Sequence, residues 1–364
     1  MLTGAEIPRI LEALASTPAS CGRFGRRCEE LLFALLGRPT LLVTSATHAL
    51  EMAAVLLGIG RGDEVIVPAY TISSTANAFV LRGAKPVFAD VDASGNLDPA
   101  EVARVLSGRT RAVVPVHYGG NSCDLDELRS VVGPLPVIED AAQAIGAAFR
   151  GIPLGAFGVC GAISFHETKN VGCGVGGALV VGDPMLVERA EQLREKGTDR
   201  RRFELGVVDR YTWVDVGSSY TLGELSAAWL SAQLEELPRI NARRGWIWEL
   251  YSRELQGPIE RAGGTVVRGR KGNSGNAHLF AIVLRSGAQR SRFIAQMAEK
   301  GVSCPFHFTA LHTSPMGRKL HDGRALPQSE KLSECLVRLP LYFQMPDDDV
   351  RRVVSSAIEV LQTL

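Results

Sequence analysis

The sequence has no marked excess of charge, since lysine and arginine total 40, aspartate and glutamate total 39, and the net charge is +1. Nucleic acids and anionic membranes attract basic surfaces, so neither partner is indicated. No apolar run reaches the length of about 18 residues that a membrane-spanning helix needs. The N-terminal residues lack a basic stretch followed by an unbroken apolar core, so no secretory signal is predicted. We therefore expect a cytoplasmic protein.

The chain also has no Cys-x-x-Cys pair, although it contains seven cysteines. An odd number of scattered cysteines favours free thiols in a reducing compartment over a disulfide framework or a zinc site. His166-Glu167 lacks the second histidine of a zinc-protease helix. His307 and His312 have no third metal ligand in the pattern, so no metal site is predicted.

A rhythm of short apolar runs and longer helical intervals fills the first two-thirds of the chain. The runs do not alternate with polar residues, which is typical of strands buried on both faces. The intervals 46–57, 73–82, 98–106, 124–131 and 184–195 are long enough for crossover helices. The runs are 41–43, 65–67, 86–88, 112–116, 137–138, 162–165 and 178–181. This pattern predicts an α/β domain with a mostly parallel seven-stranded sheet between helices.

The pattern changes after residue 223. A long helical segment over 224–255 is interrupted at Pro238, and a glycine-rich stretch over 257–275 follows. A strand over 277–284, a helix around 290–300 and a last helix after Pro346 complete the chain. We expect a large domain over residues 1–235 and a smaller C-terminal α+β domain over 236–364.

Polar residues follow several predicted strands, where ligands bind in open α/β sheets. Thr44-Ser45-Ala46-Thr47 opens a helix, which suits either a phosphate cradle or an ordinary N-cap. Asp140 follows the run at 137–138 and is either a cleft carboxylate that needs a partner or a helix cap. Lys169 follows the run at 162–165 and is either a desolvated amine able to form a Schiff base or a solvated surface lysine.

Taken together, these residues match the needs of one cofactor. Pyridoxal phosphate carries a phosphate, a pyridine nitrogen that must stay protonated, and an aldehyde that needs an amine. The glycine-rich run over 172–177 does not indicate a dinucleotide, because it precedes a strand, whereas the dinucleotide turn follows one and opens a helix.

The chain resembles the sugar-nucleotide aminotransferases of the DegT/StrS family, which are fold-type-I pyridoxal-phosphate enzymes. The resemblance rests on blocks in a constant order: 62–68 (GDEVIVP), 76–78 (ANA), 83–88 (GAKPVF), 115–119 (PVHYG), 139–143 (EDAAQ) and 164–170 (SFHETKN). Within the family it looks closest to dTDP-4-oxo-6-deoxyglucose transaminases, which make 4-amino-4,6-dideoxyhexoses. The segments 166–169, 194–198, 211–213, 217–220 and 306–312 support this.

The resemblance implies roles for the cofactor-binding residues. Lys169 would hold the cofactor aldehyde and then act as the catalytic base, and Asp140 would keep the pyridine nitrogen protonated. Gln143 would lie near the ring hydroxyl. Ala46 and Thr47, with Ser164, would hold the phosphate.

Two positions depart from the pattern of many relatives. Ile72 stands where an aromatic residue stacks on the cofactor ring. Ser219 stands where an asparagine of the partner subunit reaches the phosphate, and its hydroxyl can still donate a hydrogen bond. This position implies a homodimer with shared active sites.

The implied substrates are L-glutamate and a nucleotide-linked 4-oxo-6-deoxyhexose. Tyr70, His307 and His312 would border the sugar, although either histidine is equally well explained by packing or exposure. Arg194 belongs to a basic cluster, with Lys196 and 200–202, that would meet the diphosphate from a loop or form a salt-bridged surface.

Two other functions use the same fold. In the sugar dehydratases of the family a histidine replaces the Schiff-base lysine, whereas this chain has Lys169. A non-catalytic relative would have lost Asp140 or Lys169, and neither is lost.

Overall fold

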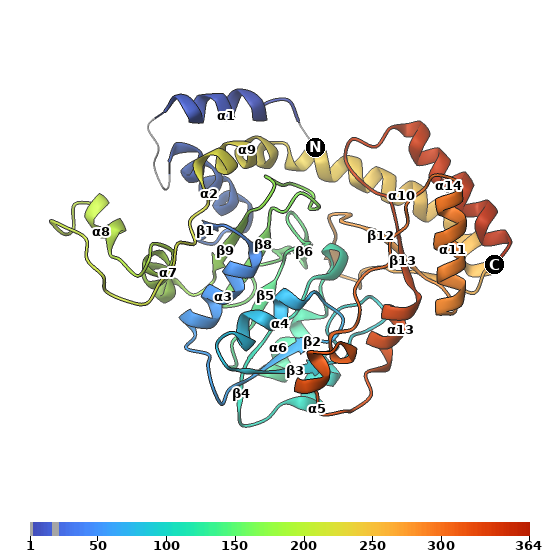
Figure 1. Cartoon of the computed structure of the whole chain (residues 1–364), viewed down its shortest axis with the longest axis horizontal. Coiled ribbons are helices and arrows are strands. Elements are labelled where there is room, and N and C mark those ends of the chain that lie inside the picture. The colour runs from blue at the N-terminus through green and yellow to red at the C-terminus, as the bar shows by residue number, and fades with distance from the viewer. Residues whose placement is uncertain (1–2, 17–21) are drawn as a thin grey trace.

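The computed structural model describes residues 3–16 and 22–364, and its centre is a seven-stranded sheet (Figure 1). The strand order is β3-β2-β4-β5-β8-β9-β1, in which the bridges Val113–Val137 and Val116–Asp140 join the two halves. β9 runs in the direction opposite to the other six strands of this sheet. The bounds are β1 (Thr40–Val43), β2 (Glu64–Pro68), β3 (Lys85–Ala89), β4 (Thr110–Val113), β5 (Ile138–Asp140), β8 (Cys160–Ser164) and β9 (Gly177–Val181). The predicted mostly parallel sheet is confirmed.

Both faces of this sheet are buried, which explains the unbroken apolar runs. Side chains alternate across a strand, so Leu42 and Ile66 join one hydrophobic core. Leu41 and Val65 join a second core on the opposite face. Any polar residue within these strands would have to find a hydrogen-bond partner inside the protein.

Helices cover the two faces. α3 packs against β8 and β9, and α2 packs against α9. Local sequence begins several of them: the side chains of Ser45, Asp98 and Asp124 cap α3, α5 and α6 by accepting hydrogen bonds from backbone N–H groups. The helices of this part are α1 (Glu6–Ala15), α2 (Arg23–Leu36), α3 (Ala46–Leu56), α4 (Ser73–Val80), α5 (Pro99–Val105), α6 (Leu125–Val132), α7 (Val187–Arg194), α8 (Arg200–Glu204) and α9 (Glu224–Glu235).

The predicted helix break at Pro238 is confirmed. α9 ends at Glu235 and α10 (Leu237–Arg261) begins with Pro238 in its first turn, where the missing N–H has no helical partner to lose. The glycine-rich stretch was predicted to begin at residue 257, but α10 continues through Gly257 and Pro258 to Arg261. Pro258 is tolerated because it lies in the last turn of α10, close to the helix end.

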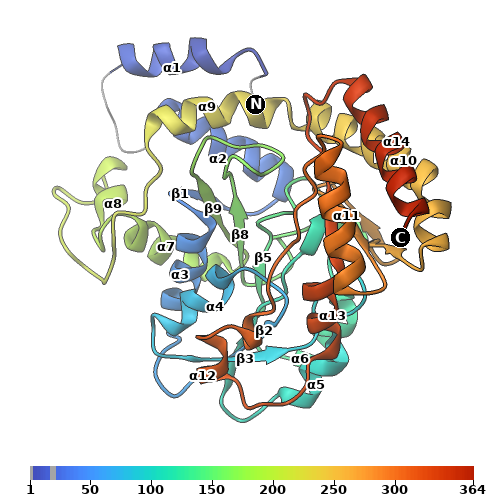
Figure 2. The ribbon, with the colours of Figure 1, turned by 45° about the vertical axis from the view of Figure 1, so that its right-hand side comes forward.

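A second, antiparallel sheet lies beside the later part of α10. It consists of β10 (Thr265–Val266), β12 (Phe280–Val283) and β13 (Leu336–Leu339). Helices α10, α11 (Gly287–Glu299) and α14 (Asp347–Gln362) cover it, as Figures 1 and 2 both show, and share its hydrophobic core. The division into domains at residues 235 and 236 stays a prediction.

Shorter elements connect these parts. They are the small sheet of β6 (Ala148–Phe149), β7 (Ile152–Pro153) and β11 (Asn273–Ser274), the helices α12 (Gly317–Leu320) and α13 (Pro327–Cys335), and the 3-10 turns η1 (Tyr118–Gly120), η2 (Pro184–Leu186) and η3 (Leu311–Thr313). The six described cysteines, at 28, 123, 160, 173, 304 and 335, are buried free thiols, and Cys21 lies outside the described residues. No helix within 3–16 and 22–364 is long and apolar enough to cross a membrane.

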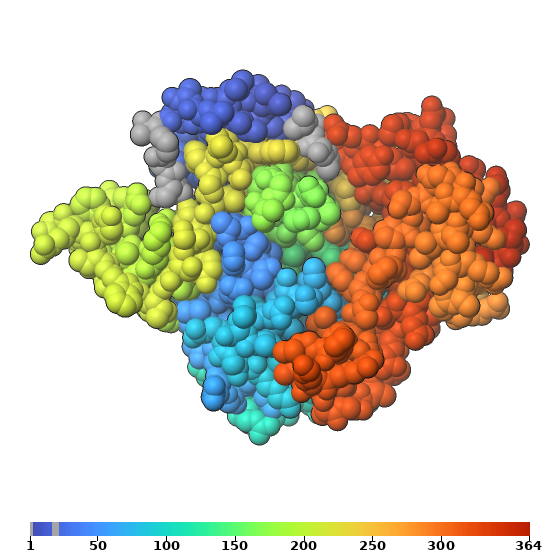
Figure 3. Space-filling model, in the orientation of Figure 1, coloured from blue at the N-terminus to red at the C-terminus, as the bar shows by residue number. Residues whose placement is uncertain are grey.

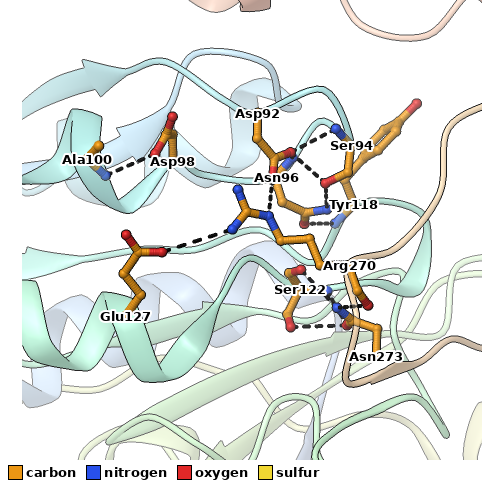
Figure 4. A network of polar contacts seen from close by, with 10 residues as sticks. All are labelled: Asp92, Ser94, Asn96, Asp98, Ala100, Tyr118, Ser122, Glu127, Arg270 and Asn273. Carbon is orange, nitrogen blue, oxygen red and sulfur yellow. Dashed lines mark hydrogen bonds and ion pairs between the residues drawn. The ribbon is translucent and has the colours of Figure 1, made fainter.

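A polar network fastens the segment before β11 to the large sheet (Figure 4). The Arg270 guanidinium donates to Asp92 at 2.8 Å, and Ser122 donates through its backbone N–H to Asn273 at 2.8 Å. On the same network, the side-chain oxygen of Asn96 accepts from the backbone N–H of Tyr118 at 3.0 Å. These contacts set the position of Tyr118, whose hydroxyl meets His307 at 2.8 Å.

Candidate active site

A cavity of about 310 Å³ opens at the carboxyl ends of the central strands. It brings together six of the predicted cofactor residues, Ala46, Thr47, Ile72, Asp140, Ser164 and Lys169, from five different segments of the chain. Ile72 is 50% exposed and lines the cavity, so an aliphatic side chain stands where many relatives have an aromatic ring.

The N-terminus of α3 forms one wall of this cavity. The Ser45 hydroxyl accepts from the backbone N–H of His48 at 3.1 Å and so caps the helix, while Ala46 and Thr47 line the cavity. The N-cap interpretation is confirmed for Ser45, and the phosphate cradle at Ala46 and Thr47 stays a prediction. A methyl group on Gly177 would overlap the backbone of Ser45 and Ala46, so glycine lets β9 approach this turn. The wall presents backbone N–H groups and the positive end of a helix dipole, which suit a phosphate.

Asp140 ends β5 and faces the same cavity. The Thr75 hydroxyl donates to its carboxylate at 2.7 Å, and the backbone N–H of Ala142 donates at 3.2 Å. Thr75 also meets the Thr71 hydroxyl at 3.0 Å. A turn, not a helix, follows Asp140, so the helix-cap alternative is wrong. Among the described residues this buried carboxylate accepts hydrogen bonds only from these neutral donors, which suits a positively charged partner such as a protonated pyridine nitrogen.

Lys169 lies in the turn after β8, where its backbone N–H donates to the His166 carbonyl at 2.9 Å. Burial lowers the pKa of its amine, the Asp140 carboxylate raises it, and the Arg338 guanidinium lowers it, with a net decrease. Lys169 is half-buried and lines the cavity, so it is not a freely solvated surface lysine. An amine with a lowered pKa is neutral over a wider pH range and available to react with an aldehyde.

The lowered pKa of Lys169 predicts how cofactor binding depends on pH. The neutral amine persists below the usual lysine pKa and is lost as the pH falls through the lowered value. The rate at which the apoprotein develops visible absorbance with added pyridoxal phosphate should therefore reach its plateau below the pH expected for an ordinary lysine. Stopped-flow absorbance across a pH series measures it, and a plateau at or above that of free lysine would contradict the burial effect.

Glu139 and His117 support Asp140 from within the core, and both are fully buried. The Glu139 carboxylate accepts the backbone N–H groups of Gly155, Phe157 and Gly158 at 2.7–2.9 Å and contacts the His117 ring at 2.7 Å. This carboxylate joins β5 to the loop before β8. It therefore holds the two strands whose ends carry Asp140 and Lys169.

Replacing that carboxylate should destabilise the fold. Glu139→Gln turns an amide NH₂ toward backbone donors and should lower the free energy of unfolding by about 3–5 kcal/mol. Equilibrium denaturation in urea measures this. The matched control Glu254→Gln changes an exposed carboxylate paired with Arg253 at 2.9 Å and should cost less than about 1 kcal/mol. Equal effects of the two substitutions would refute the role of Glu139.

Two predicted cofactor residues lie away from this cavity. The Gln143 side chain is buried and accepts the backbone N–H of Gly119 at 2.7 Å. Ser219 is exposed and pairs through its backbone with Glu195. Neither side chain lines the cavity within its own chain.

The structure also does not bring Tyr70 or His312 to the cavity. Tyr70 is 0% exposed, and its hydroxyl donates to the His307 carbonyl at 2.7 Å. His312 is buried and contacts the Glu330 carboxylate at 3.1 Å. His307 lies nearer to the site: burial, with Arg338 and Lys169 nearby, lowers its pKa to about 2, so it is neutral at ordinary pH.

Arg194 was expected in a loop, but it is the last residue of helix α7. Its side chain is buried and pairs with Glu29 at 2.5 Å. Residues 200–202 begin helix α8, and these arginines pair with Glu204, Glu191 and Glu188 at 3.1–3.9 Å. The cluster is thus the salt-bridged surface given as the alternative. Glu29 lies far from Arg194 in the sequence, whereas the partners of the three arginines of α8 lie within fifteen residues of them.

Sequence reasoning missed several residues of the site. Ser74 and Thr168 line the cavity, Thr75 holds Asp140, and Arg338 lies close enough to lower the pKa of Lys169. The run Ser73-Ser74-Thr75 follows β2, and small hydroxylic residues after a strand were a usable signal. Nothing near Arg338 in the sequence indicated its role.

A model of the DegT/DnrJ/EryC1/StrS aminotransferase family matches residues 2–358. The chain belongs to this family. Aminotransferases of this family are pyridoxal-phosphate enzymes of fold type I, so the predictions of family, fold, enzyme class and cofactor are confirmed.

Solved structures agree over the whole chain. The aminotransferase TlmJ from Streptoalloteichus hindustanus is 29% identical, with a TM-score of 0.91 over 100% of this chain and 97% of that one. DesV from S. venezuelae, solved in complex with a ketimine intermediate, is 30% identical, with a TM-score of 0.90 over 99% and 95%. An aminotransferase from Psychrobacter cryohalolentis is 25% identical, with a TM-score of 0.93 over 100% and 98%.

The residues of this family member fit the cofactor. The N-terminus of α3, which β9 approaches closely at Gly177, suits the phosphate. Asp140 suits the pyridine nitrogen, and the Lys169 amine suits the aldehyde. Among the residues with described placement, no group of three or more histidine, cysteine or acidic side chains is arranged to hold a metal ion.

Proposed function

We propose that this protein transfers the amino group of L-glutamate to the C4 ketone of a nucleotide-linked 4-oxo-6-deoxyhexose, with dTDP-4-oxo-6-deoxyglucose as the substrate. The observation that carries the proposal is that Lys169 and Asp140 line one cavity with the N-terminus of α3. The choice of sugar is supported by the segments at 194–198, 211–213 and 217–220, which resemble transaminases of that substrate.

The residues of the chain divide the chemistry between them. Pyridoxal phosphate, when bound, withdraws electrons from the carbon that loses a proton. Lys169 Nζ takes the proton from the α-carbon of glutamate, and in the second half of the reaction it delivers a proton to C4 of the sugar. Asp140 keeps a positive charge on the pyridine nitrogen, and Thr75 keeps the Asp140 carboxylate in place. Lys169 argues against a sugar dehydratase, in which histidine stands at this position.

Product analysis tests the proposal. The purified holoprotein is incubated with dTDP-4-oxo-6-deoxyglucose and L-glutamate, and the products are analysed by mass spectrometry and NMR. We expect 2-oxoglutarate and a dTDP-4-amino-4,6-dideoxyhexose in equal amounts, and the NMR couplings assign the gluco or galacto configuration. A dehydrated sugar, or 2-oxoglutarate without an amino sugar, would contradict the proposed reaction.

We also propose that the protein is a homodimer with shared active sites. The segment between α7 and α9, which contains α8, projects from the body of the molecule, as the yellow-green region of Figure 3 shows. It exposes Leu205, Val207, Tyr211, Trp213 and Val216, whereas such side chains are usually covered. A second copy would cover these side chains and bring its own Ser219 toward the cavity of the first.

A single substitution tests the dimer. Trp213 is 79% exposed, and Trp213→Glu should convert a dimer into monomers because a charge would be buried in the contact. Analytical ultracentrifugation of both proteins measures the change. Met185, which is 86% exposed outside the projecting segment, provides the control Met185→Glu, which should remain dimeric. A monomeric parent protein would refute the assembly.

A further inference from the structure

A network of amide side chains joins the two turns that carry the reactive groups of the site. Asp140 is followed by the irregular segment 141–147, and Lys169 lies in the turn after β8. Asn170, directly after the lysine, and Asn276, before β12, are 1% and 3% exposed. Because these polar side chains are buried, their hydrogen bonds fix the backbone segments to which they bind.

The Asn276 amide fastens the segment that follows β5. Its Nδ2 donates to the carbonyl oxygens of Gln143 at 2.9 Å and of Ile145 at 3.0 Å. Its Oδ1 accepts from the backbone N–H of His278 at 3.1 Å. Gly120 leaves room for this amide, since a methyl group there would overlap Oδ1. Backbone groups have fixed donor and acceptor roles, so these contacts determine which way the amide points.

The Asn170 amide fastens the turn after β8. Its Nδ2 donates to the Asn276 carbonyl at 2.9 Å and to Oδ1 of Asn241, on α10, at 2.8 Å. Asn241 in turn donates to the Ile145 carbonyl at 3.3 Å. Since a carbonyl can only accept, the Asn170 oxygen must point the other way, where it meets Nδ1 of His278 at 2.9 Å.

The orientation of Asn170 fixes the tautomer of His278. An amide oxygen only accepts, so Nδ1 of the ring must carry the proton. Burial, followed by the nearby Lys169 amine and Arg244 guanidinium, lowers the pKa of His278 well below its usual range, so the ring is neutral and Nε2 is unprotonated. Arg244 also donates to the carbonyl oxygens of Ala277 at 3.1 Å and of His278 at 2.5 Å, which holds the backbone of this histidine.

We propose that Asn170 is a positioning residue that sets the place of Lys169 relative to Asp140. The Nδ1–H of His278 holds its amide oxygen. The inference rests on the proposed roles of Lys169 and Asp140 but not on the choice of sugar. The network runs from the lysine turn through Asn276 to the segment that follows Asp140, so it resists a change in the separation of the two groups. A misplacement of about 1 Å can slow a reaction by about 100-fold.

Capture of the cofactor by the apoprotein tests the place of the amine without any substrate. Pyridoxal phosphate is added to the parent and to Asn170→Ala across a pH series, and visible absorbance is followed by stopped flow. We expect Asn170→Ala to slow capture at least about tenfold at neutral pH. The plateau should move to higher pH, because a displaced amine loses the burial that is the largest cause of its lowered pKa. The substitution leaves in place the charged and titratable groups near this amine, which are Asp140, Arg338, His278 and His307.

A matched asparagine separates this effect from a general loss of stability. Asn273 is half-buried, and its side chain exchanges hydrogen bonds with Ser122 and Arg270 at 2.8–3.4 Å. Asn273→Ala therefore removes a similar set of contacts outside the network and should keep the parental rate and plateau, even where its unfolding temperature falls. If Asn170→Ala differs from the parent in unfolding temperature alone, the proposal is overturned.

Two substitutions of His278 test the donor that holds Asn170, and they decide if Asn170→Ala does not fold. The amide nitrogen of asparagine stands where Nδ1 stands in histidine, whereas that of glutamine stands nearer to Nε2. His278→Asn should therefore keep the donor and capture the cofactor within about threefold of the parental rate, and His278→Gln should lose at least about tenfold. The reverse order would assign the ring a role through Nε2 and would overturn the assignment.

NMR reads the tautomer directly. Long-range ¹H–¹⁵N spectra of the holoprotein labelled with ¹⁵N-histidine should contain a neutral ring protonated at Nδ1 that is absent from His278→Gln. A His278 ring protonated at Nε2 overturns the proposal. If borohydride does not attach the cofactor to the parent protein, the role of Lys169 is wrong, and this inference is wrong with it. Cofactor capture as expected, without formation of the amino sugar, would contradict the proposed function alone.

Discussion

Lys169→Ala should abolish turnover while leaving the protein folded. The amine is expected both to hold the cofactor and to move the proton in each half-reaction, so its loss should lower kcat by at least about 10⁴-fold. Lys169 contributes little to stability, because within the described residues no hydrogen bond or ion pair engages its amine. Removing it should even relieve the cost of a partly buried charge.

Steady-state assays of amino sugar formation, with far-ultraviolet circular dichroism for the fold, measure both effects. Borohydride adds a second readout: the visible absorbance of the parent should bleach irreversibly, whereas the variant should show no band attached to the protein. Lys331→Ala, which changes an exposed lysine on α13, is the matched control and should have parental activity. Turnover of Lys169→Ala near that of the parent would refute the role of this amine.

Asp140→Asn should lower turnover by about 10²–10⁴-fold, the equivalent of the roughly 3–5 kcal/mol that a broken buried charge pair costs. The amide keeps the size of the side chain, and its oxygen can still accept from the Thr75 hydroxyl, which donates to the Asp140 carboxylate at 2.7 Å in the parent protein. What it removes is the negative charge that would keep the pyridine nitrogen protonated. The carboxylate also raises the pKa of Lys169, so the variant should shift the lysine pKa still lower.

Single-turnover kinetics with glutamate across a pH series measure both changes. Thr75→Val separates charge from position, because it keeps the carboxylate but removes its 2.7 Å donor. We expect about a tenfold loss for that variant, in line with one hydrogen bond to a charged group. If Thr75→Val were as inactive as Asp140→Asn, the position of the carboxylate rather than its charge would be what matters.

Local signals predicted the framework of this protein well. Strands of the central sheet are buried on both faces, and their unbroken apolar runs were therefore visible in the sequence. Pro238 marked the start of α10 because proline is best tolerated in the first turn of a helix. Asp140 and Lys169 were also found from the sequence, because each directly follows a strand whose end was recognisable.

Exposure and pairing of polar side chains were predicted less well. Arg194 was expected at a diphosphate, but it pairs with Glu29 of α2, a residue that α2 brings close only in the folded chain. Tyr70 was expected at the substrate, but its hydroxyl is taken by the His307 carbonyl. In both cases the partner lies more than a hundred residues away, where periodicity carries no information.

The order of residues along the chain was sufficient to predict the sheet, its covering helices and the places of Asp140 and Lys169 after two of its strands, since burial of a strand or helix leaves a repeating local pattern. Packing between distant segments decided the rest. It placed the guanidinium of Arg338 from β13 near Lys169, without a salt bridge to any described residue, and it buried Tyr70 just after β2. Charges and hydroxyls acquire these neighbours only when the chain folds, because desolvation and pairing depend on distance in space and not on distance in sequence.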